Sequence, residues 1–225
     1  MPAADNHETE DERLLHRMLF FSDAVFAIVL TLLALELKPP HASDPAHAVA
    51  EMANHLIAFA LSFGLVALIW TSHMNILRRL SRFDWPTSVM NLVLLAPVCL
   101  LPFASSLVSQ AWFSFLGWYF YSAVLIATSL GMIGLILVST RNAGILVGGM
   151  TRRERIYRVI RAASPGVAFA GCLVALHFGM VRAPQFMWML IPVQFGFARW
   201  LMRPQARLSD ALGTTKVDAE SSVPN

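Results

Sequence analysis

Long apolar stretches alternate with short polar segments along most of the chain. Six stretches have the length of a membrane span, at about 17–37, 50–77, 86–108, 112–139, 164–181 and 185–202. A helix needs about 20 mostly apolar residues to cross the hydrocarbon core of a bilayer. The pattern therefore predicts an all-α membrane protein, with six transmembrane helices in one domain covering residues 1–225. We expect the polar tails at about 1–12 and 205–225 to be disordered.

Proline marks an expected helix start and an expected kink. Ser164 and Pro165 are the residue types favoured at an N-cap and a first helical turn, so we expect the fifth helix to begin there. Pro97 and Pro102 lie inside the third stretch, where each lacks a backbone donor. The third helix should therefore kink or leave carbonyl groups for its neighbours to satisfy.

Basic residues concentrate in alternate polar segments. The segments after the second, fourth and sixth stretches contain Arg78, Arg79, Arg82, Arg141, Arg152, Arg153, Arg155, Arg158, Arg161, Arg203, Arg207 and Lys216. The other side has Lys38 and Arg182. The positive-inside rule then predicts cytoplasmic termini and an even number of spans. We expect residues 152–161 to form a short helix on the cytoplasmic surface, close to anionic lipid.

The composition excludes soluble classes of protein. The chain is 56% hydrophobic and 14% charged, against roughly 25% charged residues in soluble domains. We expect a multi-pass protein of the inner (plasma) membrane, surrounded by lipid and without a nucleic-acid partner. No basic segment with a cleavage site precedes the first stretch, so we expect the first helix to be retained.

The first helix combines ionisable residues with an apolar stripe. Arg17 and Asp23 lie near its start, and an ionisable residue in a membrane span normally has a partner or a function. On a helical wheel, Asp23 lies about 140° and Ser22 about 120° from Ile28. One narrow stripe contains Ile28, Thr31, Leu32 and Leu35. The partners of Ser22 and Asp23 should therefore come from other helices or other subunits.

Arg17 and the sequence Phe21-Ser22-Asp23, followed by an Ile/Leu/Thr run, resemble the first-helix motif of the transmembrane protein 175 family. This is a family of endolysosomal and bacterial potassium channels. The resemblance implies a potassium-permeable cation channel with its first helix lining the pore. Bacterial members have one six-helix repeat per chain and assemble four chains. We therefore expect a homotetramer that conducts potassium ions and has no cofactor.

The second helix has a further element of this resemblance. Trp70 and His73 share a helix face and are similar to the family's Trp-x-x-His element. The resemblance implies that they form a hydrogen-bonded structural cluster with Arg17, Phe21, Ser22 and Asp23. Many relatives have a second histidine where this chain has Met74. Leu101-Pro102-Phe103 resembles a third-helix element of the family, to which we assign a structural role.

The apolar stripe is the expected constriction of the pore. The chain has no Thr-Val-Gly-Tyr-Gly sequence, so a carbonyl selectivity filter of that kind is excluded. We expect rings of Ile28, Leu32 and Leu35 to gate by size and dewetting, with Thr31 adding a hydroxyl ring. In the family, the position five after the motif aspartate, here Ile28, faces the pore. By itself, such a stripe is more often ordinary packing.

An enzyme and a carrier are the two alternatives to a channel. Asp23 is the one clear carboxylate within a span, and no metal-ligand spacing or phosphate-binding loop appears, so we expect no enzyme, catalytic residue or metal. A carrier would favour internal repeats and broken helices, and no second Phe-Ser-Asp copy exists. The proline-bearing third helix keeps a proton- or ion-coupled carrier, or a proton-leak channel, as the alternative.

Overall fold

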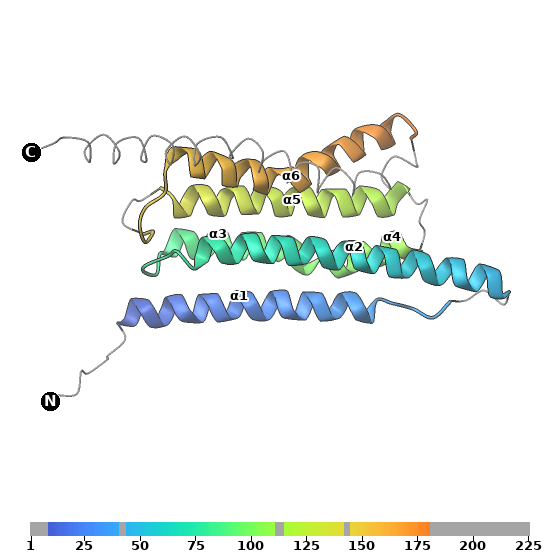
Figure 1. Ribbon diagram of the computed structural model, residues 1–225, viewed down its shortest axis with the longest axis horizontal. Helices are drawn as coiled ribbons and strands as arrows, with labels where there is room; N and C mark the ends of the chain where they lie inside the picture. The colour runs from blue at the N-terminus through green and yellow to red at the C-terminus, as the bar shows by residue number, and fades with distance from the viewer. Residues whose placement is uncertain (1–8, 41–43, 111–114, 142–144, 181–225) are drawn as a thin grey trace, which may run out of the picture.

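The computed structural model describes residues 9–40, 44–110, 115–141 and 145–180. These residues form helices that lie side by side along one direction (Figure 1). The helices are α1 (Glu10–Leu35), α2 (Pro45–Leu77), α3 (Trp85–Cys99), α4 (Leu101–Gln110), α5 (Phe115–Ser139) and α6 (Arg152–His177). With α3 and α4 taken together, this part of the chain has five segments long and apolar enough to span a membrane. The prediction of an all-helical, multi-pass membrane protein is confirmed; the predicted span 185–202 and tail 205–225 lie outside the described residues.

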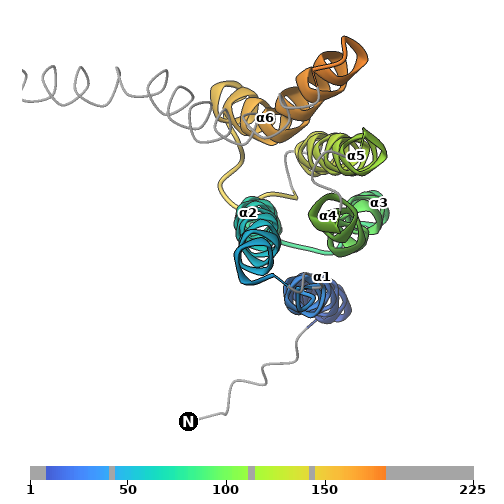
Figure 2. The same cartoon turned by 90° about the vertical axis from the view of Figure 1, so that its right-hand side faces the viewer.

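Helix α1 lies at one side of the chain. It packs against α2, α3 and α4, while α5 packs against α3, α4 and α6. The end-on view in Figure 2 places α1 and α6 on opposite sides, with the other helices between them. One face of α1 is therefore covered by the other described helices of its chain, and the opposite face is not.

The third predicted helix is interrupted, as its prolines indicated. Helix α3 ends at Cys99, and α4 starts at Leu101. The N–H of Leu100 donates to the carbonyl of Pro97, which tightens the last turn of α3. Pro102 has no N–H to continue the ladder, so the helix breaks here within one membrane span.

The helix predicted fifth, at about 164–181, differs from the prediction and is α6 of the structure. Helix α6 is continuous from Arg152, and the expected short surface helix over 152–161 is its first part. Thr151, and not Ser164, is the N-cap, and Pro165 lies inside the helix. Figure 1 shows α6 bent along its length, as expected of an internal proline. The helix continues past Pro165 because residues on both sides of it are buried.

The first helix also starts earlier than predicted. Thr9 and Glu12 form a capping box, in which each side chain accepts a hydrogen bond from the backbone N–H of the other residue. These bonds satisfy donors that a helix start would otherwise expose. Residues 10–12, which we expected to be disordered, are therefore helical.

The arginine-bearing loops meet at one end of the bundle. Figure 1 places the start of α1, the α2–α3 connection and the α5–α6 connection at the same end. Backbone hydrogen bonds join the two connections: Ser81 donates to Ile145 at 2.8 Å and Val147 to Arg79 at 2.8 Å. We call this end, with Arg79 and residues 152–161, the arginine-rich end.

Candidate functional site

The motif aspartate of α1 has its partner on α2. Trp70 Nε1 donates a hydrogen bond to Asp23 Oδ1 at 2.9 Å. This contact joins positions 47 residues apart. An indole N–H is a donor only, and an ionised carboxylate is an acceptor only, so the two groups match. The contact helps to set the rotation of α1 against α2.

A second and deeper contact involves three helices. Asn91 on α3 donates from Nδ2 to Ser22 Oγ on α1 at 2.8 Å, and Ser22 Oγ donates to the carbonyl of Met18 at 2.9 Å. His73 Nε2 on α2 lies 2.7 Å from Asn91 Oδ1. Because an amide oxygen only accepts, His73 carries a proton on Nε2 and donates it. Ser22, Asn91 and His73 thus form a continuous hydrogen-bonded chain.

The chain of hydrogen bonds lies in the packed interior. Ser22 and His73 are 1% exposed and Asn91 is 0% exposed. The ring of Phe26 packs on His73 with 5.2 Å between centroids. A buried polar group without a partner is costly in a membrane, so each member stabilises the position of the next. We call Ser22, Asp23, Trp70, His73 and Asn91 the α1 anchor.

Asn91 is the one residue of the α1 anchor that was not predicted from the sequence. It is the one asparagine in the third apolar stretch. A polar amide inside a membrane span commonly bonds across helices, so a signal was present. Its distance along the chain from the first-helix motif hid the pairing, because only the packing of α3 against α1 joins them.

The predicted pore stripe lies on the uncovered face of α1. Ile28 is 57% exposed, Leu32 40% and Leu35 77%. Thr31 is also exposed, and its hydroxyl donates to the carbonyl of Ile28 at 2.8 Å. The opposite face consists of Phe26, Val29 and Leu33, each at most 2% exposed. The fold therefore presents the stripe away from the other described helices of the same chain.

The remaining predicted residues contribute less to this geometry. Arg17 and Phe21 are exposed on α1. Within the described ranges, no hydrogen bond joins Arg17 to the α1 anchor, so its assignment to the cluster stays a prediction. Met74, at the position of the absent second histidine, is half-buried.

The segment that contains these contacts matches a known protein family. Residues 17–102 match the family described as endosomal/lysosomal potassium channel TMEM175. This segment is therefore similar to the TMEM175 family. It contains the whole α1 anchor and the stripe, and the predicted family resemblance is confirmed.

Individual relatives match over less than half of the chain. A potassium channel of Streptomyces collinus is 31% identical over 97 residues, covering 42% of this chain and 47% of the relative. A potassium channel of Chamaesiphon minutus is 32% identical over 104 residues, or 42% of this chain and 49% of the relative. The chain thus spans about half the length of these bacterial relatives. The mouse endosomal/lysosomal proton channel TMEM175 is 29% identical over 97 residues, 41% of this chain and 19% of that protein.

A solved structure extends the likeness to most of the fold. The crystal structure of a lysosomal potassium-selective channel TMEM175 homolog from Chamaesiphon minutus superposes with a TM-score of 0.63. It is 23% identical and covers 84% of this chain and 96% of that one. The helical fold is therefore shared. These relatives are named as channels, which agrees with the expectation of a non-enzyme.

Proposed function

We propose that this chain is one subunit of a potassium-permeable cation channel whose pore is lined by α1. The observation that carries the proposal is the exposed stripe on α1, within the segment that matches the family. A pore-lining face must be left free by the helices of its own chain. The names of the bacterial relatives support potassium as the permeating ion.

The proposed assembly is a homotetramer in the inner (plasma) membrane. One copy of α1 cannot enclose a pore, and its place at the side of the chain (Figure 2) lets several copies meet around an axis. Six spans per chain and cytoplasmic termini remain part of the proposal. The arginine-rich end would then face the cytoplasm.

The proposed constriction lies along Ile28, Leu32 and Leu35. Helical rise separates Ile28 from Leu35 by about 10 Å along the axis, which is longer than one ion. Rings of apolar side chains at this spacing would exclude water until they widen. Thr31, whose hydroxyl hydrogen is used within the helix, would present its oxygen as an acceptor beside them.

The α1 anchor would hold this geometry without touching the ion. The bonds of Ser22 and Asp23 go to α2 and α3, so they constrain the rotation of α1. A rotation by one residue, about 100°, would replace Ile28 in the pore by a neighbour. We therefore assign the anchor a positioning role.

Ion flux from liposomes containing the purified protein tests the function. We expect potassium efflux to exceed sodium efflux, and Ile28→Asn to increase both by hydrating the ring. Ala27→Asn is the control, since Ala27 is also exposed but points about 100° away. Val29→Asn is unsuitable as a control because Val29 is 2% exposed and packs inside the chain. Equal flux from wild type and Ile28→Asn would contradict the pore assignment.

Native mass spectrometry in detergent tests the assembly independently. We expect a tetramer as the main species. A monomer or dimer as the sole species would contradict the tetramer even if flux were present. Protease access to the C-terminal tail from the periplasmic side would contradict the proposed topology.

A proton channel is the second candidate, favoured by the name of the mouse relative. A pH-sensitive dye inside the same liposomes distinguishes the two. Proton entry without potassium or sodium flux would favour a proton channel. Potassium flux without a pH change would favour the first proposal.

A further inference from the structure

A cavity opens between α2, α5 and α6 at the arginine-rich end. Its volume is about 320 Å³. Helix α6 contributes a polar wall with Tyr157, Arg158 and Arg161, while Met132 and Ile136 of α5 contribute an apolar wall. The cavity therefore joins positively charged and apolar surfaces at one end of a membrane-spanning bundle.

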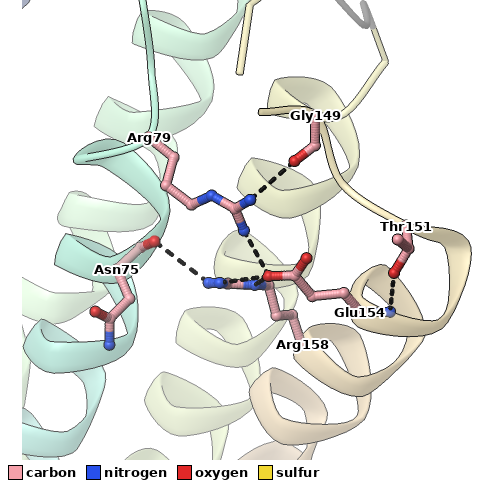
Figure 3. Close-up of polar contacts among 6 residues, drawn as sticks. All are labelled: Asn75, Arg79, Gly149, Thr151, Glu154 and Arg158. Carbon is pink, nitrogen blue, oxygen red and sulfur yellow. Dashed lines mark hydrogen bonds and ion pairs between the residues drawn. The ribbon is translucent and has the colours of Figure 1, made fainter. Parts of the chain in front are cut away.

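The charge at the mouth of this cavity is only partly neutralised. Arg79 and Arg158 both donate to Glu154 Oε1, as Figure 3 shows. Arg79 also donates to the carbonyl of Gly149 at 2.8 Å, and Arg158 to that of Asn75 at 3.3 Å. Two guanidinium groups share one carboxylate, which leaves one positive charge.

Arg158 is held in place and still has donors to offer. Its Nε and Nη2 bond Glu154 at 3.2 and 2.9 Å, and its Nη1 bonds the carbonyl of Asn75. A guanidinium has five N–H donors, so two are not used by these contacts. Arg161, one turn further along α6, also lines the cavity with its guanidinium-bearing side chain. Guanidinium groups bind phosphate oxygens well because of their planar, multiple donors.

A small apolar hollow of about 20 Å³, open at the surface, adjoins the cavity toward the middle of the bundle. It shares Ser72, Met132, Arg161 and Ala162 with the cavity. It then reaches Leu68 on the surface of α2 and Pro165 in α6. The two spaces together run from charged to apolar surroundings along the helices, as the parts of a lipid do.

We propose that this cavity binds an anionic phospholipid, with its phosphate head group at Arg158 and Arg161 and an acyl chain passing over the small apolar hollow and the exposed Leu68 on the surface of α2. The apolar continuation favours a lipid over a free phosphate-bearing anion. The cavity is lined by residues of α2, α5 and α6, and no residue of α1 or of the α1 anchor lines it. The site is therefore separate from the stripe and from the α1 anchor.

Binding of lipid to the wild-type protein is the first test. Delipidated protein in detergent is titrated with phosphatidylglycerol, phosphatidylcholine or glycerol 3-phosphate, and bound molecules are counted by native mass spectrometry. We expect phosphatidylglycerol to bind about tenfold more tightly than phosphatidylcholine, the effect of roughly one charge-assisted hydrogen bond. Equal affinity for both lipids would overturn the proposal. Glycerol 3-phosphate binding as tightly as phosphatidylglycerol would indicate a free-anion site and would also overturn it.

Matched arginine variants locate the site. Arg158→Gln and Arg161→Gln should each weaken phosphatidylglycerol binding about tenfold. Arg155→Gln makes the same charge change on the same helix at an exposed position that does not line the cavity, and should change affinity less than about twofold, as surface charges do. Equal losses of affinity in all three variants would mean that the basic surface attracts lipid in general, and would overturn the proposed site. If a cavity variant did not fold, the comparison of the two lipids on the wild-type protein would still test the proposal.

Discussion

Helices α1 and α5 have similar lengths but very different surroundings within one chain. In the most apolar window of α5, 56% of the residues are buried, against 22% in α1. Trp118, Leu125 and Leu135 of α5 are completely buried, whereas α1 buries one face and leaves the stripe uncovered. The described part of one chain thus surrounds most of α5 and leaves one face of α1 uncovered. The difference agrees with the proposal that other copies of α1 complete it.

The two helices are also held by different interactions. Between membrane helices, burial of apolar surface adds little because lipid tails are equally apolar, so close packing and hydrogen bonds dominate. Gly131 lets α5 approach the backbone of α3: a Cβ at this position would lie 2.9 Å from Leu94 Cα. Helix α1 instead relies on the hydrogen bonds of the α1 anchor.

Asn91→Leu should have the largest effect, because it breaks both hydrogen bonds of the buried chain. Ser22 and His73 would each lose a partner inside the protein. We expect the free energy of unfolding, measured by SDS titration in mixed micelles, to fall by about 2 kcal/mol. The tetramer should be lost at lower SDS concentrations, since α1 would no longer be fixed in rotation.

Asn75→Leu is the matched control for this prediction. Asn75 is exposed on α2, and it accepts the hydrogen bond from Arg158 with its backbone carbonyl and not with its side-chain amide. The same chemical change there should leave the unfolding curve nearly unchanged. Equal destabilisation by the two variants would contradict a special role of Asn91 in holding α1.

Gly131→Ala should destabilise the close packing of α5 against α3. The new methyl group would push against Leu94 Cα, which is backbone and cannot rotate away. We expect a loss of about 1 kcal/mol, because overpacking outweighs the better helix propensity of alanine. Gly64→Ala is the control, since no described atom lies within 4 Å of its added Cβ. A stabilised Gly131→Ala protein would show that α3 and α5 are not limited by this contact.

Thr9→Ala should have the smallest effect, because the start of α1 lies in water. The variant removes the hydroxyl that accepts the N–H of Glu12 at 3.3 Å. We expect a loss of about 0.5 kcal/mol of helix stability, the low end for an N-cap. Thr9→Ser retains the acceptor and should behave as wild type. Circular dichroism during thermal unfolding measures both, and a loss as large as that of Asn91→Leu would contradict the ranking.

The sequence by itself determined the class of protein and the outline of its helices. Apolar stretches of membrane length specify membrane helices, because the length and the apolar character of a span are local properties of the sequence. The first-helix motif with Ser22 and Asp23, together with Trp70 and His73, was sufficient to indicate a resemblance to the TMEM175 family. The wheel separated the stripe from the motif because helical geometry is regular.

The tertiary structure decided what local chemistry could not. The pairing of Ser22 with Asn91 depends on the packing of α1 against α3, 69 positions apart. The continuity of α6 through Pro165 depends on burial of residues on both sides of it, which outweighs the local tendency of Ser164 and Pro165 to start a helix. The cavity at Arg158 and Arg161 exists only because α2, α5 and α6 converge there. Each of these features results from side chains that are distant in sequence and meet only after folding.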